Sequence, residues 1–142
     1  MKVVFFDQLG CYAAVVAAAY MAGIIGENPQ TTEIIKLDTF AAHHDWSPGN
    51  LNYIGRNSQN EELYTLGIGK RGSLIAASAQ DLCKIMAGYE EIKIIDVSAY
   101  NSPIIKIAAY LKLNRMLQRT AVFIAAYFLK KRMPQIVRKV RY

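Results

Sequence analysis

The apolar positions at the start of the chain predict a strand followed by a helix. Residues 2–6 form a short run of β-branched and aromatic residues, typical of a buried strand, and the run ends at Asp7. An alanine-rich stretch over 11–25 then predicts a helix, whose small side chains let it lie close against a sheet. Gly23 and Gly26 are expected to end this helix.

The next part of the chain predicts a short helix and a β-hairpin. An apolar stripe over 33–42 indicates a helix that Thr31 or Thr32 can cap. Two β-type runs over 51–55 and 62–68 flank a polar, turn-rich connection, and this pattern is typical of a hairpin.

The rest of the chain alternates helices with one more strand. Ser102 and Pro103 supply a cap and a first turn, because proline fits where the amide hydrogen is unpaired. Pro134 is expected to interrupt or restart the last helix. The predicted elements are a helix over 74–88, a strand over 92–97, a helix over 104–113 and a helix from residue 119, continued over 135–141.

Strands and helices that alternate with short connections predict one α/β domain over residues 1–142. We expect a mostly parallel sheet of about four strands, with the β-hairpin adding an antiparallel strand and helices on both faces. The length suits a single domain. In such sheets ligands gather at the carboxyl ends of the strands, and that edge is where a site is expected.

Four segments carry a resemblance to a known family: 13–19, 29–34, 53–55 and 64–69. On them the chain resembles, over nearly its whole length, an uncharacterised family of short bacterial proteins from spore-forming Firmicutes, domain of unknown function family 3189. The resemblance implies an α/β fold and a cytoplasmic origin, and it brings no activity, cofactor or substrate. Family members place a small polar segment with His and Ser or Thr where this chain has Gly10-Cys11-Tyr12. This difference suggests a non-catalytic paralogue or partner subunit.

The charge is unevenly distributed along the chain. The net charge is +6, yet residues 97–142 hold ten Lys and Arg and no Asp or Glu. The first 96 residues therefore hold 17 − 10 = 7 cations against 11 anions. Such a basic end raises the odds of an anionic partner, either nucleic acid, an anionic membrane surface or an acidic protein, and the favoured alternative is a solvated helix face. The basic residues of the last helix are Lys130, Lys131, Arg132, Arg138, Lys139 and Arg141.

The apolar run before these basic residues, 121–129, is continuous rather than striped, so we expect it to be buried. This run and the one over 13–25 are shorter than the roughly 20 residues that span a bilayer. Asp7 ends the N-terminal apolar run before a signal-peptide core could form. A soluble, cytoplasmic protein without a transmembrane segment is expected.

A glycine-rich loop is the first candidate for chemistry. A GxGxxG pattern over 67–72 follows a predicted strand and opens a predicted helix, so its backbone could approach a phosphate closely and donate amide hydrogens to it. A phosphate-containing small molecule such as a nucleotide would suit this loop, whereas the pattern is not a Walker loop. A glycine-rich turn with solvated cations is the alternative. The loop residues are Gly67, Gly69, Lys70, Arg71, Gly72 and Ser73.

Two carboxylates are the second candidate. Asp7 and Asp96 each end an apolar strand, so parallel strands would bring both to the ligand-binding edge, where a pair could hold Mg²⁺ or act as acid and base. The alternative is that each carboxylate caps a helix or accepts hydrogen bonds from loop amides.

Other reactive residue types give no pattern of a site. The adjacent pair in His43-His44-Asp45 has no third ligand, so we expect a surface loop and no metal site. Cys11 and Cys83 are expected to be reduced and buried, and no GxSxG elbow occurs. The sequence identifies no cofactor. It leaves two hypotheses: an anion- or nucleotide-binding domain, or a non-enzymatic interaction module, either of which could form a homo- or heterodimer.

Overall fold

A four-stranded sheet forms the centre of the domain. The computed structural model describes residues 1–41, 51–69, 78, 91–112 and 114–141. The strand order is β2-β3-β1-β4, with β1 parallel to both β3 and β4 and β2 antiparallel to β3. The strands are β1 (Lys2–Asp7), β2 (Leu51–Arg56), β3 (Glu62–Gly67) and β4 (Ile92–Asp96). The predicted α/β fold, with a mostly parallel sheet and one hairpin, is confirmed.

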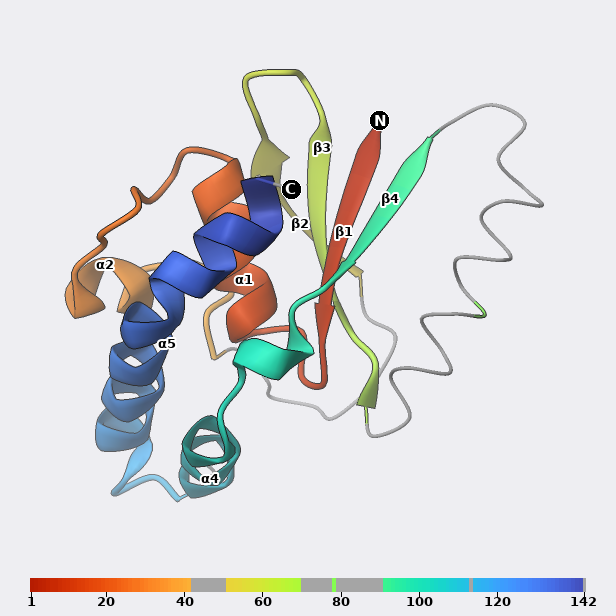
Figure 1. The fold of residues 1–142 in the computed structure, drawn as a ribbon. Helices are drawn as coiled ribbons and strands as arrows, with labels where there is room; N and C mark the ends of the chain where they lie inside the picture. Colours follow the sequence, from red (N-terminus) through yellow and green to blue (C-terminus); the bar gives the residue numbers. More distant parts are fainter. Residues whose placement is uncertain (42–50, 70–77, 79–90, 113, 142) are drawn as a thin grey trace.

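The labelled helices lie on one side of this sheet (Figure 1). Helix α1 lies closest to it, and its residues 13–19 are all buried, as small side chains against a sheet require. The predicted helix over 74–88 lies almost wholly outside the described residues. No helix within the described ranges is both long and apolar enough to cross a bilayer. The helices are α1 (Ala13–Met21), α2 (Thr31–Ile35), α4 (Pro103–Leu111) and α5 (Gln118–Arg141), with a 3₁₀ turn, η2 (Ser98–Tyr100), after β4.

The ends of two helices differ from the prediction. Helix α1 stops at Met21, and Gly23 with φ of 74° turns the chain away, as expected of a glycine stop. Helix α2 is shorter than the predicted 33–42 and its N-cap is Gln30, so capping by a threonine was wrong. The chain beyond α2 continues in turns. These bring Phe40 against the ring of Tyr12, with 5.6 Å between the ring centroids.

Helix α5 corrects the prediction for Pro134. The helix runs without a break through this proline over 24 residues. The proline ring is exposed, while Met133, Ile136 and Val137 on either side of it are buried. Burial of these side chains offsets the roughly 3 kcal/mol that an interior proline costs a helix.

The apolar run over 121–129 is only half buried, which also corrects the prediction. Ala125 and Leu129 lie in the core, whereas the side chains of Phe123 and Tyr127 are 51% and 42% exposed. A helix that packs on one side buries positions three and four residues apart, and the residues between them point to water whatever their polarity.

Candidate functional site

The turn after β1 is closed around Asp7, a side chain with no exposed surface. Its Oδ1 accepts hydrogen bonds from the amides of Leu9, at 3.0 Å, and Gly10, and its Oδ2 accepts one from Ala14 at 3.0 Å. Burial raises the pKa of the Asp7 carboxyl, while these amides and the side chain of Asn101 act to lower it. The carboxylate therefore caps helix α1 from within the fold.

Asn101 completes this cap from a distant part of the chain. Its buried Oδ1 accepts a hydrogen bond from the amide of Ala13 at 3.1 Å. The N-cap residue of α1, Tyr12, makes no side-chain cap hydrogen bond, so Asp7 and Asn101 satisfy the first amides of the helix instead. A helix N-terminus is the usual anion site of such folds, and here the protein's own carboxylate occupies it.

Two glycines let the turn press against β3. Gly10 has φ of 74°, and a Cβ built on it would lie 2.5 Å from the nitrogen of Gly67. A Cβ on Gly67 would in turn lie 2.8 Å from the carbonyl oxygen of Leu9. Beyond this contact, the amide of Ile68 donates to the carbonyl of Asp7 at 3.1 Å and that of Gly69 to the carbonyl of Gln8 at 3.0 Å. These two loop amides are therefore not available to a ligand.

The two predicted carboxylates do not face each other. Phe6 pairs with Asp96 across the parallel strands, so the side chains of Phe6 and Asp96 share one face of the sheet and Asp7 points to the other. Asp96 is exposed and accepts hydrogen bonds from the amide and hydroxyl of Ser98, at 2.9 and 2.5 Å. The geometry brings no acid-base pair together at these positions.

The cysteine in the turn is shielded. Cys11 is 5% exposed, and burial, followed by the nearby Asp7 carboxylate, raises the pKa of its thiol. A thiol held in its protonated form is a poor nucleophile and a poor metal ligand. Within the described part of the chain, no group of three or more His, Cys, Asp and Glu side chains is placed to hold a metal ion.

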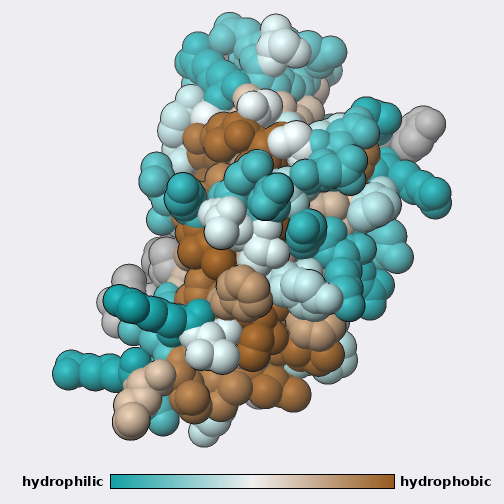
Figure 2. All heavy atoms as spheres, turned by 90° about the vertical axis from the view of Figure 1, so that its left-hand side faces the viewer, coloured by the Kyte–Doolittle hydropathy of each residue, from teal (hydrophilic) through white to brown (hydrophobic). Residues whose placement is uncertain are grey.

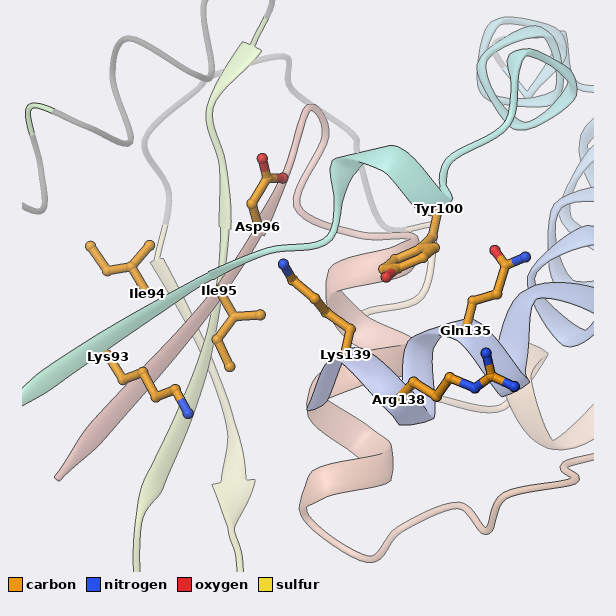
Figure 3. Close-up of a pocket in the computed structure, with 8 residues that line it drawn as sticks. All are labelled: Lys93, Ile94, Ile95, Asp96, Tyr100, Gln135, Arg138 and Lys139. Carbon is orange, nitrogen blue, oxygen red and sulfur yellow. The ribbon is translucent and has the colours of Figure 1, made fainter. Parts of the chain in front are cut away.

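An open groove lies between edge strand β4 and the C-terminal half of α5 (Figure 3). It has a volume of about 780 Å³. Lys93 extends from β4 toward α5, and Lys139 extends from α5 toward β4 (Figure 3). Tyr100, from η2, stands at one end of the groove. The residues that line it are Lys93, Ile94, Ile95, Asp96, Tyr100, Gln135, Arg138 and Lys139.

The charge of this basic groove is largely uncompensated. Three cations line it, Lys93, Arg138 and Lys139, against the single carboxylate of Asp96. Among the described residues no ion pair joins any of these cations to a carboxylate. Cations gathered without carboxylate partners create a positive potential, which attracts anions.

The basic residues of the last helix, predicted as one group, are divided by the fold. Arg138 and Lys139 line the basic groove, whereas Arg141 forms an ion pair with Glu27. The remaining three, Lys130, Lys131 and Arg132, do not line it. Asp96, Arg138 and Lys139, which no sequence pattern connects, thus line the same groove.

Several predicted residues lie outside the described ranges. They are Lys70, Arg71, Gly72 and Ser73 of the glycine loop, His43, His44 and Asp45, and Cys83. The predicted contribution of the glycine loop beyond Gly69 stays a prediction.

Sequence reasoning missed three polar residues of the groove, Lys93, Tyr100 and Gln135, besides the apolar Ile94 and Ile95. Lys93 carried a weak signal, because it is the one charged residue inside the otherwise apolar start of a predicted strand. Tyr100 and Gln135 gave no signal, since their meeting depends on how α5 packs against η2 and the other helices.

Comparison with known proteins gives a family and no activity. No curated protein and no solved structure matches the chain. A family model described as a protein of unknown function (DUF3189) matches residues 2–142, nearly the whole chain. The chain therefore belongs to this family of proteins of unknown function, DUF3189.

Proposed function

We propose that this domain is a binding module for a small phosphate-bearing molecule, held in the basic groove between β4 and α5. The observation that carries the proposal is the convergence of Lys93, Arg138 and Lys139, from two elements, on one hollow without ion-pair partners among the described residues. Lysine offers point charges to a phosphate, and arginine offers a planar pair of donors that matches two phosphate oxygens.

The polar residues at the ends of the groove suit the rest of such a ligand. Tyr100 offers a ring and a hydroxyl, and Gln135 offers an amide that can donate and accept. The volume of about 780 Å³ lies in the range of small-molecule sites and is large enough for a nucleotide.

The turn at Asp7 is the less favourable place for a phosphate. A ligand at the α1 N-terminus would have to displace the Asp7 carboxylate, which already accepts from Leu9, Gly10 and Ala14. In the glycine loop, the amides of Ile68 and Gly69 donate to the backbone, so only loop residues beyond Gly69 would serve a ligand. The loop remains the alternative location within the same proposed function.

Ligand titration followed by NMR tests the proposal on the full chain. Inorganic phosphate, pyrophosphate and ATP are added to the wild type and to the Arg138→Ala, Lys139→Ala double variant. We expect amide shifts confined to 93–100 and 135–139, and a dissociation constant raised about tenfold or more in the variant, since two charge-assisted contacts are lost. Affinity should also fall as salt screens the groove.

A matched variant separates the groove from general charge. Lys36→Ala with Lys130→Ala removes the same two charges from exposed positions that do not line the groove. It should bind like the wild type. The proposal fails if none of the three anions shifts the groove amides, or if both double variants weaken binding equally. Shifts confined to residues beyond Gly69 would place the phosphate in the glycine loop instead.

A further inference from the structure

One end of the domain presents large apolar side chains to solvent. Helix α4, the turn at 114–117 and the first half of α5 meet there, at the lower end of the domain in Figure 1. Met116 is 91% exposed, Tyr110 76% and Ile107 59%. We call this surface the apolar corner. Its residues are Ile104, Ile107, Tyr110, Met116, Leu117, Phe123 and Tyr127.

The space-filling view shows an apolar surface at this end of the domain. In Figure 2 apolar atoms collect at the lower end of the face formed by α4 and the start of α5, with hydrophilic side chains projecting beside them. Scattered apolar residues are normal on a protein surface, but a contiguous group marks a contact with a partner or a membrane.

The turn that carries Met116 is held in place by hydrogen bonds. The side-chain oxygen of Asn114 accepts a hydrogen bond from the amide of Met116 at 3.1 Å. The backbone carbonyl of Asn114 accepts one from the amide of Leu117, also at 3.1 Å. The amide of Ala121 then donates to the carbonyl of Leu117 at 2.8 Å, which joins the turn to α5. The exposed apolar side chains are therefore presented by an ordered turn.

The charged residues that α4, the turn and α5 themselves contribute around the corner are all of one sign. Lys106 on α4, Arg115 in the turn and Arg119 on α5 are exposed beside it, and residues 97–142 contain no Asp or Glu. A second copy of the chain meeting this surface symmetrically would place these cations against their own copies, and α4, the turn and α5 supply no carboxylate to lie between them. Like charges in contact disfavour that dimer, so the complementary partner is an anionic one.

We propose that the apolar corner docks this domain on the surface of an anionic lipid bilayer. Aromatic and aliphatic side chains flanked by Lys and Arg are the composition of segments that lie in the membrane interface. The corner is the end of a helix pair and projects from the domain, so its side chains can enter a fluid bilayer without a shaped partner. Met116, Tyr110 and Phe123 insert among the acyl chains, and Arg115 and Arg119 contact the headgroups.

Vesicle co-sedimentation of the full chain tests the proposal. Vesicles of phosphatidylcholine alone are compared with vesicles in which phosphatidylserine replaces part of it. We expect binding to the anionic vesicles alone. The Met116→Ser, Phe123→Ser double variant should bind about tenfold or more weakly, since each substitution removes an apolar side chain that would be buried in the bilayer. Arg115→Ala should reduce binding about fivefold, the effect of one basic residue near an anionic surface.

Control variants separate the corner from other surfaces. Ile24→Ser removes an apolar side chain that is 56% exposed elsewhere, and Lys36→Ala removes an exposed cation elsewhere. Both should bind vesicles like the wild type. All exchanged side chains are exposed, so far-ultraviolet circular dichroism should be unchanged. The Arg138→Ala, Lys139→Ala variant should also keep vesicle binding, which makes the result independent of the basic groove.

Three outcomes would overturn the proposal. The first is no more binding to anionic than to neutral vesicles. The second is vesicle binding lost in the groove variant and kept in the corner variants, which would assign the lipid headgroup to the groove. The third is light scattering that finds a dimer dissociated by the Met116→Ser, Phe123→Ser variant, together with no vesicle binding, which would make the corner a protein interface.

Discussion

The turn after β1 and the basic groove beside β4 offer positive potential in opposite ways. At the turn, the amides of Leu9, Gly10 and Ala14, the last two of them buried, are already satisfied by the carboxylate of Asp7. At the groove, the charges of Lys93 and Lys139 are open to solvent and carry no ion pair among the described residues. The first arrangement stabilises the fold, and the second is free to bind.

This difference shows that the place where the fold type predicts an anion site need not bind a ligand. The end of β1 is where an α/β sheet usually receives an anion, and the helix N-terminus there has the required amides. The internal carboxylate takes the place of that anion, so the geometry typical of a ligand site serves folding here. A binding function then falls to a surface that the fold type alone does not indicate.

Removing the internal carboxylate should have the largest effect. Asp7→Ala leaves two buried amides and one partly buried amide without an acceptor, and each buried unpaired donor costs about 1–3 kcal/mol. We expect the free energy of unfolding, measured by urea denaturation, to fall by about 3–4 kcal/mol. Asp96→Ala is the matched control, because that carboxylate is exposed, and it should cost about 0.5 kcal/mol or less. A loss below about 1 kcal/mol for Asp7→Ala would contradict the capping role.

Crowding the same turn should have the next largest effect. Gly10→Ala adds a Cβ that would meet the nitrogen of Gly67 at 2.5 Å, in a backbone with φ of 74°. We expect it to destabilise the protein by about 2–3 kcal/mol, since the left-handed conformation alone costs about 1–2 kcal/mol. Gly23→Ala has the same φ with open space around it, so it should cost only the conformational part. Equal losses at both positions would show that the close contact with β3 has no energetic weight.

Removing cations from the groove should change stability least. Arg138→Ala and Lys139→Ala each take away an exposed charge without an ion-pair partner among the described residues. We expect the free energy of unfolding to stay within about 0.5 kcal/mol of the wild type, although ligand binding is weakened. A loss above about 1 kcal/mol would mean that these side chains hold α5 on the sheet, and the contrast between the two regions would disappear.

Local sequence determined the elements whose signals lie within a few residues. The hairpin of β2 and β3 follows from two β-type runs around a polar turn, and α4 begins at Pro103 because proline suits a first helical position. The parallel, mostly buried strand β1 follows from a continuous apolar run before an alanine-rich helix. The position of Asp7 at the end of an apolar run also marks this residue. The sequence leaves its role open between a ligand-binding carboxylate and a helix cap.

The tertiary structure alone decided the rest, because it depends on which surfaces meet. Register placed Asp7 and Asp96 on opposite faces of the sheet, and a shift of one residue would have reversed that. Packing of α5 on one side kept the helix continuous through Pro134 and left Phe123 and Tyr127 in solvent. The position of α5 beside β4 made the basic groove from residues about 40 positions apart, a distance at which pattern and propensity carry no information.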